Sequence, residues 1–301
     1  MQDYTKFLKK DSFPIFLFHG VTQTQKIYKI RNYNKKHITK DHFYKACFEL
    51  SKAGNIISMD DVYKILTKKK KLKPYSFAIT FDDGFKNNLK VAAPILYDLN
   101  LPTTFYVTTN FINNNFMSWV DRIERELEKY SKTRINVPWG TYKAKTNKDK
   151  IIFLNNLRKV LKSNPNYNPD EIANDIIYQL GRDIKLTGTS ELDKKMTWND
   201  IKLLNSEKIF TIAPHSHNHK ILSFCDEKNL EIEISHSIKM LKDKAKIKNL
   251  HFAYPDGQRN HYNQKVISSL KKNRVHCCPT AINGLNKIFT NPFQLKRIMV
   301  V

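Results

Sequence analysis

Short apolar runs alternate with amphipathic segments along most of the chain. Apolar residues recur at helical spacing within residues 40–53, where Phe43, Cys47 and Leu50 would share one face. The intervening apolar runs are rich in β-branched and aromatic residues and are predicted to be buried strands, near residues 15, 56, 78, 105, 211, 252 and 276. Strands separated by helices indicate an α/β fold with parallel pairing, arranged as an incomplete (β/α) barrel.

This alternation stops between residues 114 and 194. Helix-like patterns cover residues 118–130, 149–161 and 170–180, and the strand pattern returns only at residue 209. Neither end of this stretch has the composition of a flexible linker. We therefore expect residues 1–301 to form a single domain, with 114–194 as a helical insertion packed beside the functional site.

Acidic residues follow the predicted strand that ends at Phe81. Asp82 and Asp83 are succeeded by Gly84, and such a sequence often only caps a helix after a tight turn. Two adjacent carboxylates in a buried pocket, however, raise each other's pKa unless a cation offsets them. A bound metal ion would be such a cation. His19 ends the first predicted strand and either faces the same edge of the sheet or bonds a neighbouring loop.

Three histidines occur within five residues after the strand predicted near residue 211. His215 and His219 share a face of a helix, whereas in an extended segment His217 would join them, so the spacing leaves the ligand set open. Such a cluster favours a metal site over a solvated group of histidines. With Asp83 as the third ligand, open positions would remain for water and substrate, which is typical of a catalytic metal ion.

The composition adds a strong positive charge. Lysine and arginine number 52 against 28 acidic residues, which gives a formal net charge of +24. Such a surface attracts phosphate-bearing substrates or an anionic membrane face, although a general lysine-rich bias explains it equally well. The lysines are scattered and do not form a basic stripe with aromatic residues, so no nucleic-acid partner is expected.

Cysteine spacing and the N-terminal sequence bear on the location of the protein. Cys47, Cys225, Cys277 and Cys278 have no CxxC spacing, and the adjacent pair is poorly suited to a disulfide, so reduced thiols are expected. The apolar run 13–18 is short and broken by proline, unlike a signal peptide or a membrane span. The expectation is a cytoplasmic protein, at most in contact with the membrane surface.

Several motifs resemble, in the expected order, the polysaccharide deacetylase family, which is carbohydrate esterase family 4 with its NodB-type homology domain. The likeness extends from about His19 to Val301 and leaves the insertion outside the common core. Its main motifs are Thr80-Phe81-Asp82-Asp83-Gly84, His215-Ser216-x-x-His219 and Phe252-Ala253-Tyr254-Pro255-x-Gly257, supported by Met196-Thr197-Trp198 and Leu295-x-Arg297-Ile298-x-Val300.

This resemblance implies a distorted (β/α)7 barrel and a metal-dependent hydrolase that removes an N-acetyl group from an amino sugar. It implies Asp82 as the general base. It also implies that Asp83, His215 and His219 hold a divalent ion, in the first place Zn²⁺, with Co²⁺, Ni²⁺, Mn²⁺ and Fe²⁺ as alternatives. The oxyanion would be stabilised by the metal and by a backbone N–H near Tyr254.

Two family features differ in this chain. The Arg-x-Pro-Tyr segment is replaced by Ala253-Tyr254-Pro255, so the arginine that commonly supports the base is absent from that place. No Leu-x-His motif supplies a general acid near the C-terminus, which leaves His19 and His276 as candidates. The remaining histidines are expected to be structural or on the surface, namely His217, His236, His251 and His261.

The expected substrate is an N-acetylated amino sugar of a surface glycan or of its lipid-linked or nucleotide-linked precursor. Two other functions stay open. The same site could hydrolyse another linear or cyclic amide, because one fold hosts many activities. The chain could also be a catalytically silent glycan-binding protein, but such a protein does not need Asp82, Asp83, His215 and His219 together. The sequence gives no information on the oligomeric state.

Overall fold

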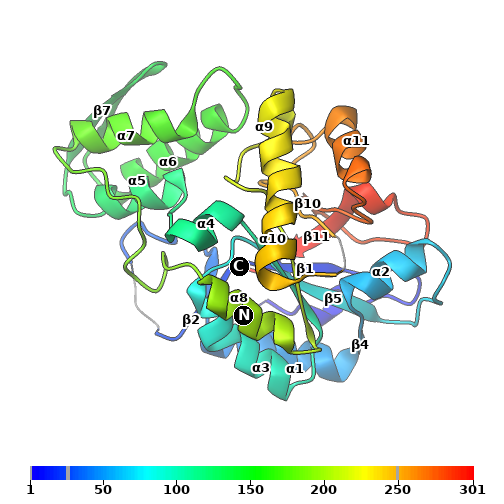
Figure 1. Ribbon diagram of the computed structural model, residues 1–301. Helices are drawn as coiled ribbons and strands as arrows, with labels where there is room; N and C mark the ends of the chain where they lie inside the picture. The colour runs from blue at the N-terminus through cyan, green and yellow to red at the C-terminus, as the bar shows by residue number, and fades with distance from the viewer. Residues whose placement is uncertain (1, 25–27, 249–250) are drawn as a thin grey trace.

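A parallel sheet forms the centre of the molecule, which we describe from a computed structural model covering residues 2–24, 28–248 and 251–301. Its strands lie in the order β10-β11-β1-β5-β6-β9, β4 also pairs with β5, and every pairing is parallel. This arrangement confirms the predicted α/β fold (Figure 1). The strands of the sheet are β1 (Ile15–Phe18), β4 (Asn55–Ile56), β5 (Ser76–Phe81), β6 (Thr103–Val107), β9 (Phe210–Pro214), β10 (Pro279–Asn283) and β11 (Leu295–Met299).

Helices surround the sheet and cover its buried strands. The main apolar core lies between them and includes Phe16, Phe43, Phe81 and Phe105. A short parallel pair, β2 (Gly20–Thr22) with β3 (His37–Thr39), leads into the first of these helices. The helices are α1 (Lys40–Ala53), α2 (Met59–Leu66), α3 (Ala93–Asp98), α4 (Thr109–Asn114), α8 (Trp198–Ser206), α9 (Glu227–Glu231), α10 (Ser237–Ala245) and α11 (Gln264–Lys272).

The segment predicted as a strand near residue 252 connects the two edges of the sheet without being a regular strand. The N–H of Phe252 donates to the Cys277 carbonyl (3.1 Å), and the N–H of Ala253 donates to the Pro214 carbonyl (3.2 Å). The N–H of Tyr254 donates to the Pro279 carbonyl (3.3 Å). Leu250, where the predicted strand begins, lies outside the described residues. Residues 251–254 therefore occupy the space between β9 and the chain just before β10.

The strand predicted near residue 276 begins later, at Pro279. The turn after α11 reaches Arg274, whose backbone is left-handed with a φ of 61°. Cys277 makes only an isolated bridge to His251 before the regular strand starts. The chain therefore needs several residues to leave the turn and become extended.

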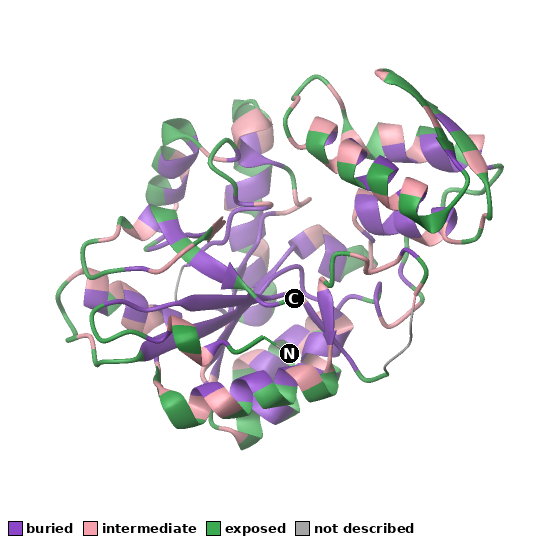
Figure 2. Cartoon of the chain, turned by 180° about the vertical axis from the view of Figure 1, so that it is seen from behind, coloured by how far each residue is buried: buried purple, intermediate pink, exposed green. Residues whose placement is uncertain are grey.

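Residues between β6 and β9 build a lobe beside the sheet with an apolar cluster of its own, as Figure 2 shows by the buried inner faces of its helices. Its helices begin at side-chain caps, including Asn168, whose amide oxygen accepts the N–H of Asp170 (3.0 Å). The elements of this lobe are α5 (Trp119–Leu127), α6 (Asn147–Leu161), α7 (Pro169–Gln179) and the antiparallel hairpin β7 (Thr133–Val137) and β8 (Gly140–Ala144).

The hairpin is the part of this lobe that the sequence does not predict. Its buried positions Ile135 and Val137 alternate with the exposed Arg134 and Asn136, and so short an alternation is a weak signal. The helical insertion predicted over 114–194 therefore also contains a hairpin, at residues 133–137 and 140–144.

Two further expectations concern the thiols and the membrane. All four cysteines are free, as the sequence predicts. Among the residues that the structure describes, no helix combines the length and the apolar character needed to cross a bilayer.

We expect the lobe to depend on its own apolar cluster for stability. Leu154 on α6 is fully buried in it, and Leu154→Ala should lower the free energy of unfolding by about 2–5 kcal/mol, because truncation leaves a cavity. Ile152 on the same helix is 56% exposed, so Ile152→Ala is the matched control. Urea unfolding followed by circular dichroism measures both. Equal, small losses in the two variants would show that the cluster contributes little.

Candidate metal centre

The carboxyl ends of β1, β5 and β9 meet at one edge of the sheet, and each carries a residue with metal-binding or acid–base chemistry. His19 follows β1, Asp82 and Asp83 follow β5, and His215 follows β9. Together with His219 they line one cavity of about 330 Å³. Chain segments that are far apart in the sequence therefore place five titratable side chains around one space.

Asp83, His215 and His219 form a compact set of donors. One candidate ligand atom from each lies within 4.8 Å of the others. The Nε2 atoms of His215 and His219 are 3.6 Å and 3.3 Å from Asp83 Oδ1. This oxygen is buried and accepts no hydrogen bond from the described residues. A buried carboxylate oxygen without a hydrogen bond, faced by two imidazole nitrogens, fits a divalent ion such as Zn²⁺.

Hydrogen bonds outside this set fix the direction of the imidazoles. Nδ1 of His215 lies 2.8 Å from the Ala253 carbonyl, to which it donates, so Nε2 keeps its lone pair toward Asp83. Ser216 and His219 both have left-handed backbones, with φ of 66° and 60°. The Ser216 hydroxyl accepts the N–H of His219 (2.9 Å). Residues 215–219 thus form a tight turn, and this turn brings the two imidazoles together.

His217 points away from the set of donors. Its Nδ1 lies 2.8 Å from the Thr109 hydroxyl, and its ring meets the edge of His236. Its backbone N–H donates to the Glu233 carboxylate (3.2 Å), as does that of Asn218 (2.8 Å). The geometry thus leaves His215 and His219 as the candidate ligands. The spacing of the three histidines alone does not make this choice.

Glu233 is a residue of this site that the sequence does not reveal. It is 1% exposed and lies in the π-helical segment η4 (Ile232–His236), from which it holds the turn that carries both imidazoles. Its one sequence signal is an acid next to apolar positions of a predicted helix, and this pattern occurs on many helices without a functional role.

The backbone of the turn after β5 packs closely against side chains of β6 and α4. Asp83 and Gly84 have positive φ angles of 74° and 75°. A Cβ at residue 84 would lie 2.9 Å from Ile112 Cδ1 and 3.2 Å from Val107 Cγ1. Glycine is therefore required both by the left-handed backbone and by the lack of space. The strained conformation of Asp83 is the kind that persists where surrounding structure holds a functional side chain.

Asp82 is held by an arginine from the other end of the chain. Arg297 on β11 donates from Nη1 to Oδ1 (2.8 Å) and from Nη2 to Oδ2 (2.7 Å) of Asp82. Burial alone would raise the pKa of Asp82, but the guanidinium outweighs it, and the pKa lies below its ordinary value. Arg297 therefore supplies the arginine that is missing at residue 253. The sequence includes Arg297 in a supporting motif but does not predict what it does.

The pKa values of the donor set are coupled. Burial would raise the pKa of Asp83, but the adjacent His219 imidazole outweighs burial and holds this pKa well below the usual range. Burial would lower the pKa of His219, but Asp83 reverses the shift and raises it. Burial lowers the pKa of His215. In the absence of a metal ion, His219 thus holds a proton more readily than His215 does.

The other candidate residues differ in position. His19 is half-buried and lines the cavity, and desolvation lowers its pKa to about 4 despite the charges of Asp83 and Asp82. The structure does not bring His276 to the site, because its ring stacks on Tyr63 on the outside of the sheet (4.8 Å). Of the two candidate general acids, His19 therefore lines the same cavity as the carboxylates, and His276 lies away from it.

Tyr254 lines the cavity, but its polar groups are engaged. Its side chain is fully buried, and its hydroxyl donates to the Phe293 carbonyl (3.1 Å). Its backbone N–H donates to the Pro279 carbonyl (3.3 Å). The N–H of Tyr254 itself is therefore engaged, because the residue bridges to the start of β10, and the expected donor near Tyr254 has to be another backbone N–H.

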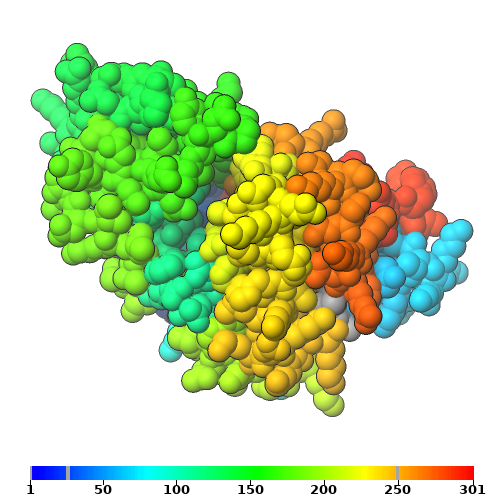
Figure 3. Space-filling model, turned by 45° about the horizontal axis from the view of Figure 1, so that its top comes forward, coloured from blue at the N-terminus to red at the C-terminus, as the bar shows by residue number. Residues whose placement is uncertain are grey.

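Basic residues that line the cavity are each matched by a carboxylate. Lys36 pairs with Asp121 (2.7 Å) and Arg158 pairs with Glu124 (2.7 Å), both acids lying on α5 of the lobe. Lys162, just after α6, pairs with Asp256. The large positive charge of the chain is therefore not concentrated at the site. Figure 3 shows the lobe and helices α9 and α10 on either side of a hollow in the surface.

His261 also lines the cavity, although the sequence analysis expects a structural or surface residue. Its Nδ1 accepts the N–H of Gln258 (3.2 Å), and its Nε2 donates to the Lys162 carbonyl (3.1 Å). Because both ring nitrogens are used, His261 acts as a link between the lobe and the loop that contains Asp256.

Solved structures of deacetylases share this fold over nearly the whole chain. A deacetylase from Streptococcus pyogenes, PplD in complex with acetate, is 14% identical with a TM-score of 0.62, over 96% of this chain and 92% of that one. IcaB from Ammonifex degensii is 14% identical with a TM-score of 0.61, over 98% and 94%. A de-N-acetylase from Aggregatibacter actinomycetemcomitans is 16% identical with a TM-score of 0.59, over 96% and 94%.

Sequence comparison identifies a family for the chain but no curated relative. None of the curated proteins matches the chain in sequence. The sequence pattern of the polysaccharide deacetylase family, in contrast, matches residues 69–276, which include Asp82, Asp83, His215 and His219. This match covers well over half of the chain and contains the donor set described above, so the chain belongs to the polysaccharide deacetylase family.

Proposed function

We propose that this protein is a metal-dependent N-deacetylase that removes the acetyl group from an amino sugar of a surface glycan or of its precursor. The observation that carries the proposal is the buried Asp83 Oδ1, which lacks a hydrogen bond within the described part of the chain and faces Nε2 of His215 and His219. A divalent ion held by these three residues, Zn²⁺ or one of Co²⁺, Ni²⁺, Mn²⁺ and Fe²⁺, polarises a carbonyl and lowers the pKa of water. Membership of the family supports glycan deacetylation.

Asp82 is the residue that accepts a proton from the attacking water. It lies beside the donor set, with its Oδ2 3.7 Å from His215 Nε2, and its lowered pKa keeps it ionised at neutral pH. The bidentate contact with Arg297 fixes the carboxylate in one orientation. Asp82 is thereby positioned before substrate binds, which reduces the reorganisation needed in the reaction.

Cleavage of the C–N bond requires that the amide nitrogen gain a proton. The proton available for this step is the one taken from water by Asp82. Its transfer to the nitrogen turns amide plus water into amine plus acetic acid, which then releases its own proton to become acetate. Because its pKa is about 4, His19 is neutral at neutral pH and cannot donate a proton unless it first takes one up. We propose that His19 relays the proton from Asp82 to the nitrogen.

A backbone N–H is proposed to stabilise the oxyanion. The N–H groups of Ala253 and Tyr254 donate to Pro214 and Pro279, and Pro255 has no N–H. The next one is that of Asp256, for which the described residues provide no backbone acceptor. Its left-handed φ of 56° places it in the turn that lines the cavity.

The unpaired positive charge lies outside the cavity. It therefore supports a lipid-linked or nucleotide-linked substrate, or contact with an anionic membrane, only by attraction to the outer surface of the protein. The net charge is +24, but Lys36, Arg158 and Lys162 at the cavity are paired with carboxylates. A phosphate-bearing substrate would therefore be attracted over a distance rather than bound beside the donor set.

Metal content tests the three proposed ligands. After dialysis against Zn²⁺ and removal of the excess, wild-type protein should carry about one ion per chain, as expected of a single site with three protein ligands. Asp83→Ala and His215→Ala should each lose it. The control His276→Ala should keep it, because this ring lies outside the cavity. Elemental analysis measures all four proteins, and retention of the ion in Asp83→Ala would contradict the assignment.

A substitution of Asp82 separates the base from the ligands. Asp82→Asn should retain the metal ion but lower kcat for acetate release from N-acetylglucosamine oligosaccharides by about 10²–10⁴, the usual contribution of a general base. Acetate is measured by a coupled assay, with His276→Asn as the control at wild-type rate. Unchanged kcat in Asp82→Asn would remove Asp82 from the chemistry, and absence of acetate from wild-type protein would remove the proposed function.

Metal binding should also depend on pH. The pKa of His219 is raised by Asp83, so a proton competes with the metal ion below a pH that lies above the ordinary histidine value of 6.5. Zn²⁺ affinity should fall by about tenfold per pH unit below that point. Asp83→Asn should move the midpoint to lower pH as well as weaken binding. Chelator competition at a series of pH values tests this, and an identical midpoint in both proteins would refute the coupling.

A further inference from the structure

Lys195 is a buried lysine to which the proposed reaction gives no role. The residue is 4% exposed, and its Nζ has no hydrogen-bond partner within the described part of the chain. Burying an ammonium group without such a partner costs free energy. Its position therefore calls for a feature of the surroundings that compensates this cost.

Two aromatic rings hold the ammonium group. Its Nζ lies 3.2 Å from the ring centroid of Phe85 and 5.2 Å from that of Phe111, and ring faces attract a cation. Phe85 belongs to the turn that carries Asp83. Phe111 on α4 stacks on the His219 imidazole, with 6.0 Å between the ring centroids. The rings therefore place the charge next to the elements that carry two of the three candidate ligands.

Backbone contacts fix Lys195 against the turn after β5. Lys195 forms an isolated antiparallel bridge with Phe85. The N–H of Met196 donates to the Gly84 carbonyl (3.0 Å), and the N–H of Lys195 donates to the Asn115 side-chain oxygen (2.9 Å). The position of the charge is thus set by the same segment that orients the carboxylates.

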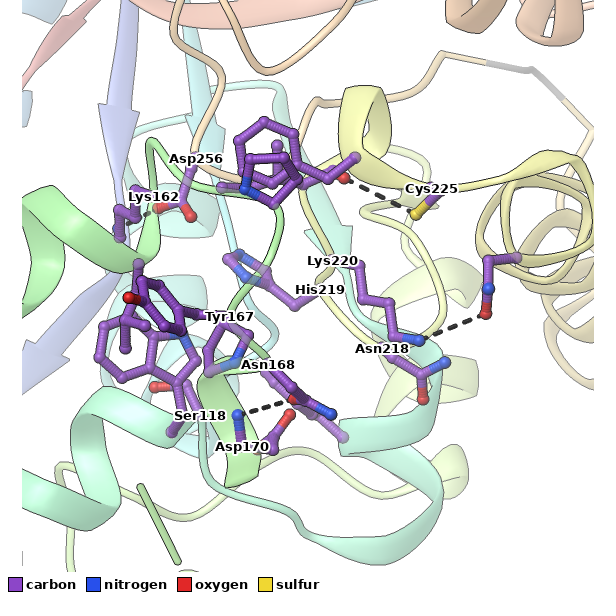
Figure 4. A pocket seen from close by; sticks show the side chains of 18 of the residues that line it. Ser118, Lys162, Tyr167, Asn168, Asp170, Asn218, His219, Lys220, Cys225 and Asp256 are labelled. Atoms are coloured by element: carbon purple, nitrogen blue, oxygen red, sulfur yellow. Dashed lines mark hydrogen bonds and ion pairs between the residues drawn. The ribbon is translucent and has the colours of Figure 1, made fainter. Parts of the chain in front are cut away.

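Other cations around the donor set are neutralised by carboxylates in direct contact. Each is charge-paired within the described residues, and Figure 4 shows one of these pairs beside His219. The pairs are Arg297 with Asp82, Lys36 with Asp121, and Lys162 with Asp256. Lys195 differs from them, because its charge is not cancelled by a carboxylate that it touches.

Asp83 is the carboxylate that interacts most strongly with this charge. Burial lowers the pKa of Lys195 to about 8, and of the charges that oppose this effect Asp83 is the strongest, followed by the already paired Asp121. Burial would raise the pKa of Asp83, and Lys195 is among the groups that reverse this shift, although His219 has the larger effect. At pH 7 Asp83 thus has a counter-charge that does not occupy its free oxygen.

We propose that Lys195 is a positioning residue whose charge holds Asp83 ionised while leaving Asp83 Oδ1 open to a divalent ion. A positive charge at this place weakens the attraction of any cation to the donor set. It also favours the negative charge that forms on the substrate oxygen during hydrolysis. Lys195 therefore lowers metal affinity and raises the rate. This inference rests on the proposed function.

Opposite changes in metal affinity and rate test the proposal. Lys195→Met removes the charge and keeps an unbranched side chain. At pH 7, chelator competition should show about tenfold tighter Zn²⁺ binding than in wild-type protein, the factor that one pKa unit represents. A competing proton gains less than Zn²⁺, because it carries half the charge. With saturating Zn²⁺, kcat for acetate release from N-acetylglucosamine oligosaccharides should fall about tenfold.

Three further variants separate charge from structure. Lys194→Met removes the same charge from the adjacent, exposed lysine and should change neither quantity, because solvent screens it. Lys195→Gln is a second neutral variant and should repeat the result of Lys195→Met. Lys195→Arg keeps the charge and should bind Zn²⁺ more weakly than both neutral variants. Circular dichroism compares the folding of all these proteins with that of the wild type.

Direction decides the outcome, because damage to the turn would weaken Zn²⁺ binding. The proposal is overturned if neither neutral variant binds Zn²⁺ more tightly than wild-type protein, if both fail to fold, or if kcat does not fall. Acetate release by wild-type protein separates the two proposals. Release together with equal Zn²⁺ affinities overturns the role of Lys195 alone. Tighter binding in the neutral variants, without release by wild-type protein, overturns the deacetylase function alone.

Discussion

Two adjacent carboxylates buried at the end of β5 impose the constraint on which the rest of the site depends. A buried charge is costly unless it is paired, and Asp82 and Asp83 are paired in different ways. Asp82 receives both donors of Arg297, whereas Asp83 Oδ1 receives no hydrogen bond from the residues that the structure describes and faces two imidazoles. One carboxylate is thus fixed as an ionised group and the other is left available to a cation. These different roles of the two carboxylates require that β11 lie beside β1, because Arg297 is on β11. They also require the turn at residues 215–219, because this turn brings the two imidazoles together.

The lobe between β6 and β9 completes the site without contributing to the donor set. Its acids on α5 neutralise basic residues that would otherwise face the cavity, and Lys162 joins it to the turn at Asp256. The lobe also places Trp119 in the lining of the cavity. The lobe has an apolar cluster of its own, and segments held on a rigid scaffold commonly carry binding residues.

Local sequence patterns predict most of the parallel sheet and the residues that meet at its edge, but they place a strand near residue 252 and miss β11. Asp83, His215 and His219 follow strands, and parallel strands carry their carboxyl ends to one side. What the sequence does not predict depends on long-range or weak signals. Arg297 reaches Asp82 across 215 residues, and only the pairing of β11 with β1 brings them together. The rotation of His217 toward Thr109 depends on two left-handed residues, and the hairpin in the lobe has too short an alternation to be identified.

The central claim is that Asp83, His215 and His219 jointly bind one divalent ion. The most direct test is a crystal structure of protein loaded with Zn²⁺, with data collected on both sides of the zinc absorption edge. The account predicts one anomalous peak about 2.0–2.2 Å from Asp83 Oδ1 and from Nε2 of both histidines. No peak at this place, with Asp83 Oδ1 bonded instead to a protein donor or only to water, would contradict it.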